Sequence, residues 1–310
     1  MKKLLIFFAL LALGTGVIAQ QKDTVKKALS ADSLMNSLSA DSSSRQPILS
    51  AFKSTRLIFS PTTETVKKNN LNFVVIHRFG DIGTGPGGPK TAFGLDAVAD
   101  VYIGLEYGIT TNLQVMLGRS AVGQIGETQL KYAILHQTNN DSSPLNITLL
   151  AGEGIRPYGN FASFSDRLSY IGEAIFSRKF SSAFSLEILP IYVQDTQPLP
   201  NVAGNEQGFF SVAAAARLKV TRSMSIVADY EHPFSNFRTS ANGFEDPIGF
   251  GAEFQTGGHV FTLNITNARA VSQINTLSNS TSSYGSGQFR FGFTISRMFD
   301  FNPKKEDKKW

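Results

Sequence analysis

The sequence contains no cysteine, which excludes disulfides, thiolate metal sites, cysteine nucleophiles and a lipid anchor attached through cysteine. Beyond the N-terminus it has no apolar run that approaches the ~18 residues of a transmembrane helix. Charged residues make up only 17% of the chain, and its net charge of +5 is not arranged as a basic stripe with interleaved aromatics. A nucleic-acid partner is therefore not expected.

The N-terminus has the features of an export signal. Lys2 and Lys3 precede an apolar run over residues 4–13, and small residues follow at the spacing of a cleavage site. We predict a signal peptide over residues 1–19. A retained membrane anchor is the alternative, but the run is shorter than the roughly 20 residues that a span requires. The exported chain is then soluble, surface-attached or a β-barrel.

The chain is rich in glycine and phenylalanine, with 27 and 25 residues, and in alternating segments. From Phe93 to Gly108 every second residue is apolar, and three carboxylates, Asp96, Asp100 and Glu106, lie between them. Successive strand side chains point to opposite faces, so one face here is apolar and the other is polar. A usual strand has ~5–6 residues, whereas a tilted strand that crosses a bilayer needs ~9–11. This segment therefore predicts a strand of a membrane barrel.

Twelve strand candidates can be counted from Leu71 onward, and alternation is clear in most of them. The exception is 169–180, where isoleucines share a face with Glu173 and Lys179. The candidates lie at 71–79, 93–107, 112–120, 127–136, 145–154, 169–180, 184–193, 207–219, 224–231, 248–255, 259–267 and 288–299.

The connections between these candidates are sorted by length. Those after even-numbered strands are mostly short, with 137–144 as the exception, and those after odd-numbered strands are mostly long, with 121–126 as the exception. Outer-membrane barrels alternate short periplasmic turns with longer external loops, whereas a soluble sandwich has no reason to do so. An even strand number then places both termini on the periplasmic side.

The last strand candidate supplies a further signal. Its residues from Gln288 to Phe299 alternate aromatics and end in phenylalanine, and a charged tail follows. The pattern resembles the C-terminal strand that the barrel-assembly machinery of Gram-negative bacteria recognises. An ordinary edge strand would leave a row of phenylalanines exposed to aggregation.

We therefore predict an all-β fold, a transmembrane antiparallel up-and-down β-barrel of about twelve strands, over residues 53–301. Only closure of the sheet satisfies every backbone group of a chain that faces hydrocarbon. A soluble β-sandwich or a lipocalin-like barrel is the nearest alternative, with the apolar side chains turned inward and the charges outward.

The remaining segments are predicted from composition. Residues 20–52 are rich in Ser, Ala and Asp and are expected to form a disordered periplasmic linker. Residues 55–69 are expected to form a pre-strand packed at the barrel entrance, and residues 302–310 a charged C-terminal tail.

If the apolar side chains face lipid, the polar positions line the lumen. Barrels of about eight strands fill with side chains and those of about 16–18 leave a channel, so twelve strands leave two interpretations open. Either the wall charges pair and brace a closed lumen, or they line a polar passage and tune its selectivity. The lumen-facing candidates are Asp96, Asp100, Glu106, Arg119, Glu127, Lys131, Glu173, Arg217, Lys219, Asp229, Glu253 and Arg290.

Motifs for other chemistry are weak. Residues 83–88 fit the dinucleotide pattern G-x-G-x-x-G, but prolines and then a strand follow where a helix is needed, so no cofactor is expected. The four histidines lack metal-ligand spacing, so no metal is expected.

A hydrolase site at the external rim is a third possible function. Asp229, Glu231, His232 and Asp246 are candidates to cluster there, close in sequence to the end of one strand. No nucleophile motif accompanies them, and no enzymatic activity is expected.

Several short segments stand out along the chain: Thr55-Arg56-Leu57-Ile58, Glu64-Thr65, Phe73, His77-Arg78-Phe79-Gly80, Tyr107-Gly108-Ile109-Thr110, Asn112-Leu113, Gly118-Arg119-Ser120, Leu130-Lys131-Tyr132 and Asn267-Ala268-Arg269-Ala270. Together they resemble an exported barrel family of unknown function that is common in Bacteroidota. The resemblance covers most of residues 53–299 and implies an outer-membrane barrel without an assigned activity.

These observations predict a non-enzymatic outer-membrane protein. The favoured function is a narrow channel, or a passage for a solute or lipid, with a charged lumen. The alternative is a structural or docking barrel with a braced, closed lumen that recruits periplasmic partners through residues 20–69. Membrane lipid and the barrel-assembly machinery are the other expected partners.

Overall fold

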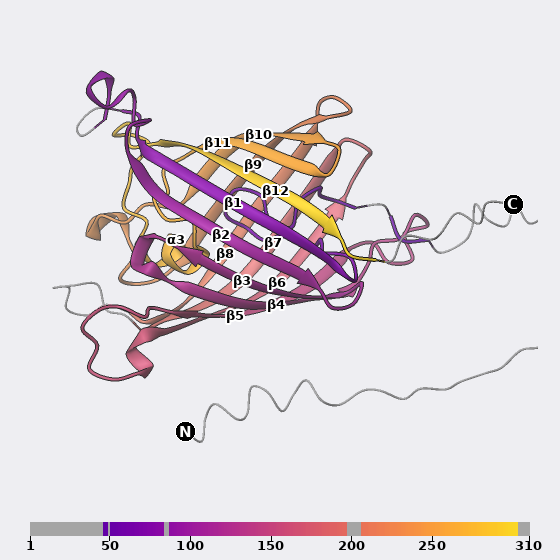
Figure 1. The fold of residues 1–310 in the computed structure, drawn as a ribbon, viewed down its shortest axis with the longest axis horizontal. Coiled ribbons are helices and arrows are strands. Elements are labelled where there is room, and N and C mark those ends of the chain that lie inside the picture. The colour runs from indigo at the N-terminus through magenta and orange to yellow at the C-terminus, as the bar shows by residue number, and fades with distance from the viewer. Residues whose placement is uncertain (1–45, 49, 84–86, 197–205, 303–310) are drawn as a thin grey trace, which may run out of the picture. The chain divides into compact units, whose positions relative to one another are not determined.

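The computed structural model describes residues 46–48, 50–83, 87–196 and 206–302 of the chain. The predicted signal peptide, the predicted linker up to residue 45 and the predicted tail from residue 303 lie outside the described residues. Twelve antiparallel strands form one closed barrel, in which each strand pairs with the next along the chain and the first pairs with the last (Figure 1). The predicted fold is confirmed.

All twelve predicted strands are present. Their bounds are β1 (Asn70–Asp81), β2 (Val98–Gly108), β3 (Leu113–Ser120), β4 (Gly126–Leu135), β5 (Asn146–Ile155), β6 (Leu168–Lys179), β7 (Phe184–Asp195), β8 (Gly208–Lys219), β9 (Met224–Phe234), β10 (Ile248–Thr256), β11 (His259–Thr266) and β12 (Arg290–Asp300).

The second strand begins later than predicted. Residues 89–91 form a short 3-10 helix, and Ala92 and Phe93 follow with left-handed φ angles of 47° and 57°. Asp96 therefore lies in the connection, exposed, and not on the strand. The alternation of residues 93–97 continues the pattern of β2 into a turn, where period two has no structural meaning.

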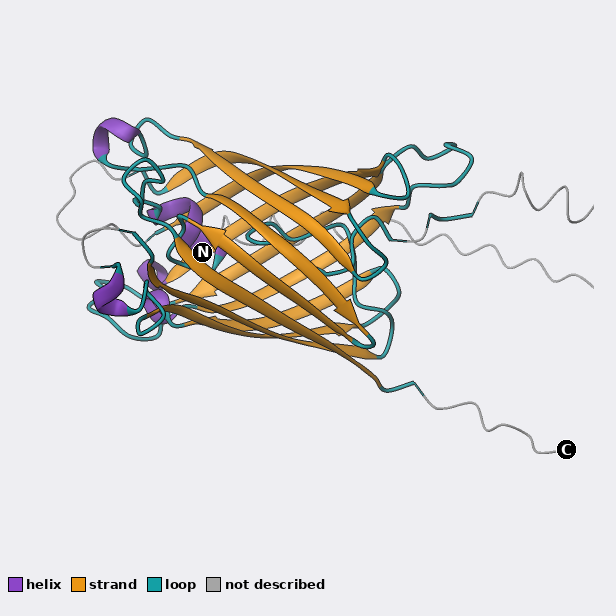
Figure 2. Cartoon of the chain, turned by 90° about the horizontal axis from the view of Figure 1, so that it is seen from above, coloured by secondary structure: helices purple, strands orange, loops and turns teal. Residues whose placement is uncertain are grey.

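Within the described residues, the helical elements all lie in connections that follow odd-numbered strands, at one end of the barrel (Figure 2). We call this the long-loop end, and the opposite end, where Asn70 pairs with Asp300, the short-turn end. No helix within the described residues has the length and apolar character to span a membrane. The elements are η1 (Pro89–Thr91), η2 (Val122–Gln124), η3 (Ser165–Arg167), η4 (Ser240–Asn242) and α3 (Gln273–Asn279).

The outer face of the barrel carries the apolar side chains, as the alternation predicts. Aromatic pairs lie toward each end of this face, with Phe180 near Phe184 at the short-turn end and Tyr192 near Phe210 toward the long-loop end. Aromatic girdles that flank an apolar band are typical of membrane barrels. Exposed apolar residues of the face include Leu105, Leu117, Leu130, Tyr132, Leu149, Ile188, Ile226, Phe250, Leu263 and Phe291.

The inner face of the wall is closely fitted. Tyr102 points inward from β2 and is 1% exposed. It lies across Gly118 of β3, where a Cβ atom would come within 1.9 Å of the phenol oxygen. Glycine at this position therefore makes room for an aromatic ring inside the barrel.

Candidate functional site

Two segments of the chain fill the lumen from opposite ends. The first, residues 51–66, enters from the short-turn end and is here called the N-terminal plug. Its Phe52, Leu57, Ile58 and Phe59 are each at most 2% exposed. The prediction of a pre-strand at the entrance is wrong, because the apolar part of the segment packs inside the barrel against Ala215, Val227 and Ala268.

The plug folds back on itself in the lumen. Arg56 and Pro61 form an antiparallel bridge, and the turn between them is closed by the Leu57 N–H, which donates to the Ser60 carbonyl at 2.9 Å. Ala51 and Phe52, which composition assigned to the linker, are also buried here. A short hairpin therefore occupies the interior.

Asp229, on the inner face of β9, holds the tip of this hairpin. One carboxylate oxygen accepts the backbone N–H groups of Ile58, Phe59 and Ser60 at 3.2, 2.7 and 2.9 Å. The other oxygen accepts the Ser60 hydroxyl at 2.7 Å. Successive peptide N–H groups that converge on one anion form a nest, and hydrogen bonds to an ionised acceptor are stronger than neutral ones.

A glycine on the neighbouring strand allows this close approach. Gly249 of β10 pairs with Asp229, and a Cβ atom there would lie 2.9 Å from the Ile58 side chain. Any larger residue would push the hairpin tip away from the carboxylate.

Other wall residues bond mainly to the backbone of the plug. Lys131 donates to the carbonyls of Thr55 and Thr62, each at 3.1 Å. Glu106 accepts the Thr55 hydroxyl at 2.7 Å. Further anchors are Gln114 to Val66, Thr148 to Thr63, Ser177 to Thr63, Ser185 to Ala51, and Glu253 to Ser54.

The second segment, residues 267–280, folds into the lumen from the long-loop end and is here called the inward loop. It contains α3, whose Ile274 and Leu277 are each 1% exposed. They pack against an apolar part of the inner wall, so this side of the barrel has a core like that of a soluble protein. The wall residues of the cluster are Ile125, Leu150, Ile171, Ile175, Leu189, Ile191, Val193, Phe209 and Ala213.

Carboxylates of the wall also hold the inward loop. Asp100 accepts the Val271 N–H at 2.7 Å, Glu127 accepts the Ser272 hydroxyl at 2.6 Å, and Glu231 accepts the Gln273 amide at 2.8 Å. These contacts compensate part of the cost of burying the three carboxylates.

Arginines complete the anchoring of this loop. Arg156 is buried, pairs with Asp195 at 3.0 Å and donates to Asn275 at 2.7 Å. Arg238, in the connection after β9, donates to the Ser278 carbonyl at 3.1 Å. Burial lowers the pKa of the Arg238 guanidinium from its ordinary value, while nearby carboxylates act in the opposite direction.

Arg78 of β1 joins the two segments. It is 1% exposed, and it donates to the carbonyls of Ala268 and Ala270 in the inward loop and, at 3.3 Å, to the carbonyl of Ile58 in the plug. Its guanidinium also lies 5.1 Å from the centre of the Phe59 ring. The two segments therefore meet inside the barrel and share one cation.

The structure places most of the predicted lumen residues in this assembly. Asp96 lies in a turn, and Arg119 lies on the outer side of β3, exposed, where it donates to the Gln124 carbonyl. Arg119 shares the parity of Leu117, which is exposed on the apolar face, so its assignment to the lumen contradicts the alternation. Lys219 is exposed at the end of β8. Buried on the inner face are Asp100, Glu106, Glu127, Lys131, Glu173, Arg217, Asp229, Glu253 and Arg290.

Two buried carboxylates do not hold inserted chain. Within the described residues, neither oxygen of Glu173 on β6 or of Glu187 on β7 has a hydrogen-bond partner. Arg217, by contrast, pairs with Glu253 at 2.7 Å. Glu173 and Glu187 are thus carboxyl groups of the inner wall that neither inserted segment binds within the described residues.

Sequence reasoning missed the residues that close the lumen. The apolar inner wall was visible only as the irregular 168–179 strand, where Ile171 and Ile175 share a face with Glu173. Apolar residues on both faces of a barrel strand indicate that something apolar packs inside, as Ile274 and Leu277 do.

The predicted rim cluster is divided by the wall. His232 pairs with Asp246 at 2.8 Å, and Asp246 also accepts the Tyr230 hydroxyl at 2.5 Å. Asp229 and Glu231 point into the lumen, because neighbouring strand residues face opposite sides. Within the described residues, no group of three or more His, Asp or Glu side chains is placed to hold a metal ion.

A family model described as "membrane bound beta barrel domain (DUF5777)" matches residues 52–299 of the chain. The match contains all of β1 to β11, most of β12, nearly all of the plug and the whole inward loop. No curated protein matches the sequence.

Solved outer-membrane barrels resemble the structure at low identity. The NanC porin aligns over 74% of this chain and 100% of its own, with 10% identity and a TM-score of 0.47. The KdgM porin aligns over 75% and 99%, with 7% identity and a TM-score of 0.43. An outer membrane channel from Pseudomonas putida F1 aligns over 76% and 98%, with 9% identity and a TM-score of 0.45. Such likeness concerns architecture and says nothing of a shared substrate.

Proposed function

The chain belongs to the DUF5777 family of membrane-bound β-barrel domains, and from that premise we propose that it is an outer-membrane passage closed at rest by its own N-terminal plug. The observation that carries the proposal is the bonding of Asp229. Its carboxylate accepts three peptide N–H groups of the hairpin tip instead of facing an open pore. In this proposal the plug closes the passage, and charged residues of the wall hold it in place by hydrogen bonds.

Burial of apolar side chains keeps the gate closed. Phe52, Leu57, Ile58 and Phe59 are each at most 2% exposed within the lumen. Returning four such side chains to water costs on the order of 6–12 kcal/mol. Thermal opening is then rare, so opening requires force or a partner that acts on the residues preceding the plug.

A lumen without the plug is predicted to prefer cations. Removal of the plug also removes Arg56, and it leaves Glu173 and Glu187 to face the passage together with the carboxylates that had held the hairpin. A pore lined by one excess sign attracts the opposite ion. The carboxylates concerned are Glu106, Glu173, Glu187, Asp229 and Glu253, against the cations Arg78, Lys131 and Arg217.

The proposal includes the cellular location of the protein and its partners. The protein is exported to the outer membrane of a Gram-negative bacterium, of the Bacteroidota, with its long loops outside and both termini in the periplasm. Lipid covers the apolar outer face, and the assembly machinery recognises β12 during insertion. Because most of residues 51–66 are buried, a periplasmic partner contacts the residues before them. We propose no catalytic activity.

Planar-bilayer recordings test the gate. Wild-type protein is expected to be silent, whereas a variant with residues 51–66 replaced by a Gly/Ser segment of equal length is expected to show stepwise, cation-preferring conductance. The matched control carries the same replacement within residues 20–45 and is expected to stay silent. Conductance in wild-type protein, or silence in the plug variant after correct insertion is verified, contradicts the proposal.

The packing of α3 supports a second candidate, a structural or docking barrel with a permanently closed lumen. Ile274 and Leu277 pack against the inner wall in an apolar cluster that contains no residue of the plug. In that case the plug variant is silent, and deletion of residues 20–45 removes the periplasmic partners recovered by cross-linking. Unchanged partners after this deletion contradict the docking function.

A further inference from the structure

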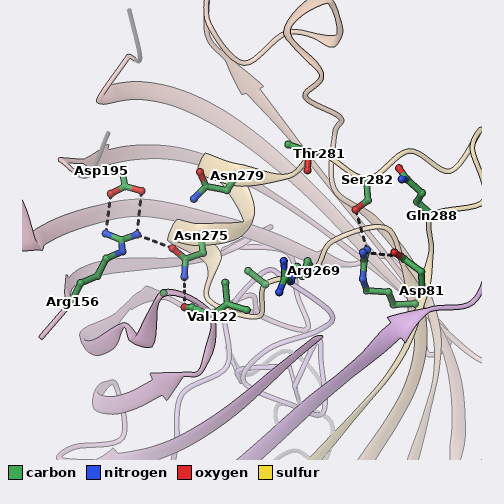
Figure 3. A pocket seen from close by; sticks show the side chains of 13 residues that line it. Asp81, Val122, Arg156, Asp195, Arg269, Asn275, Asn279, Thr281, Ser282 and Gln288 are labelled. Atoms are coloured by element: carbon green, nitrogen blue, oxygen red, sulfur yellow. Dashed lines mark hydrogen bonds and ion pairs between the residues drawn. The ribbon is translucent and has the colours of Figure 1, made fainter. Parts of the chain in front are cut away.

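A polar vestibule opens at the long-loop end of the barrel, above the inward loop. Its cavity has a volume of about 450 Å³. The floor is the inward loop, and the sides are the ends of β1, β7 and β12 together with η2 (Figure 3). This volume lies within the ~300–1,000 Å³ typical of small-molecule sites.

Charge in the vestibule is unevenly compensated. Arg156 pairs with Asp195 at 3.0 Å, and Arg290 pairs with Asp81 at 2.7 Å. Within the described residues Arg269 makes no side-chain hydrogen bond or ion pair, and Figure 3 shows it between these two aspartates. Three arginines and two aspartates line the cavity, so one positive charge is in excess.

The backbone around Arg269 is rigidly held although its side chain is exposed. Ala268 and Ala270, on either side, are buried, and both of their carbonyls accept hydrogen bonds from Arg78. Asn267 is fixed in turn by Arg290, which donates to its carbonyl at 2.7 Å. A guanidinium presented from an anchored peptide loses less entropy when it binds a ligand than one on a free loop.

Neutral polar groups surround the guanidinium. The amide of Asn279 and the hydroxyl of Thr281 line the cavity without hydrogen-bond partners within the described residues, and Gln288 also lines it. Such groups bind hydroxyls as donors and acceptors. Among the described residues that line the cavity, only Val122 and Ala270 have apolar side chains.

We propose that this vestibule binds a small hydroxylated carboxylate of the sugar-acid class, with its carboxylate on Arg269 and its hydroxyls on the surrounding amides and hydroxyls. Guanidinium matches a carboxylate through two parallel N–H donors, which gives orientation as well as charge recognition. The proposal goes beyond the proposed gate, and binding is measurable whether or not the barrel conducts.

Calorimetry on the full chain in detergent micelles tests the site with three probes: D-glucuronate, D-glucose and inorganic phosphate. We expect glucuronate to bind wild-type protein about tenfold more tightly than glucose, as one charge-assisted pair implies. Arg269→Gln is expected to bring the affinity for glucuronate to within about twofold of that for glucose. Because the Arg269 side chain makes no contact that the fold requires, this variant is expected to fold.

The remaining variants and outcomes separate the alternatives. Lys90→Gln removes an exposed cation of the same end outside the cavity and is expected to leave binding unchanged. Arg269→Lys keeps the charge but loses the two parallel N–H donors of the guanidinium, and it is expected to bind glucuronate with intermediate affinity. Equal binding of glucuronate and glucose, or full glucuronate binding by Arg269→Gln, overturns the proposal. Phosphate that binds as tightly as glucuronate indicates an inorganic-anion site and also overturns it.

Discussion

The N-terminal plug and the inward loop fill the same lumen but are joined to the wall in different ways. Both bury apolar side chains, and wall carboxylates bind the backbone of both, as Asp229 does in the plug and Asp100 in the loop. Within the described residues the plug is joined to a wall strand only on its C-terminal side, through β1, whereas the inward loop is joined on both sides, to β11 and β12. The plug can therefore leave the lumen without a change in the wall, and the loop cannot. The difference indicates that the plug is the movable part and the loop the fixed one.

Substitution of Asp229 is expected to break this comparison most strongly. Asp229→Ala leaves three peptide N–H groups and one hydroxyl without their acceptor, and each unpaired buried donor costs about 1–3 kcal/mol. Because water reaches some of these donors, we expect the free energy that holds the plug in the lumen to fall by on the order of 3–6 kcal/mol. Amide hydrogen exchange is expected to accelerate at residues 58–60 and to stay unchanged at 273–279. Asp229→Asn keeps one acceptor oxygen and is expected to show a smaller effect. Unchanged amide hydrogen exchange at residues 58–60 would contradict the claim that Asp229 holds the hairpin tip.

The reciprocal change targets the inward loop. Ile274→Ala leaves a cavity in the apolar cluster and is expected to cost about 2–4 kcal/mol. Hydrogen exchange is expected to accelerate over 273–279 while residues 58–60 stay protected. Ile188→Ala, on the outer face, is the control and is expected to leave both segments protected. If Ile274→Ala loosens both segments equally, they move as one body and the distinction fails.

The smallest expected effect is the loss of one hydrogen bond between the wall and the plug. The hydroxyl of Thr148 donates to the Thr63 carbonyl of the plug at 3.0 Å. Thr148→Val keeps the shape and removes this bond, so we expect a loss of about 1 kcal/mol. Exchange near residues 63–65 reports it, and Thr128→Val, exposed on the outer face, serves as the control. An effect as large as that of Asp229→Ala would show that the nest is not the main anchor.

The barrel wall could be predicted because each strand shows its two environments in its own sequence. Lipid outside and polar groups inside impose a period of two on each strand, as in Val101, Ile103 and Leu105 of β2. That period marks the strands, and the sorting of loop lengths, the aromatic last strand and the predicted export signal add the orientation with apolar side chains outward. The same rule would have excluded Arg119, whose parity is that of Leu117.

The filling of the lumen could not be predicted in the same way. The plug is bonded through peptide groups, which every sequence has, so Ser60 and Thr62 carry no distinctive pattern for the contacts they make. Its partners lie far away in sequence, with Asp229 more than a hundred residues from Phe59. Only the resemblance of the segments around Leu57, Arg78 and Ala268 to one family hinted that they belong together, and Arg78 is where they meet.

The position of Arg78 links interior contacts to assembly of the barrel. It lies on the first strand, and its partners Ala268 and Ala270 lie directly after β11, in the connection to the last strand, so these contacts link the two ends of the wall that meet where β1 pairs with β12. A slip of two residues would keep the side chain inside but carry it about 7 Å along the strand, away from both carbonyls. Arg78 therefore stabilises one register of β1 against β12, because only in that register does it reach the inward loop inside the barrel.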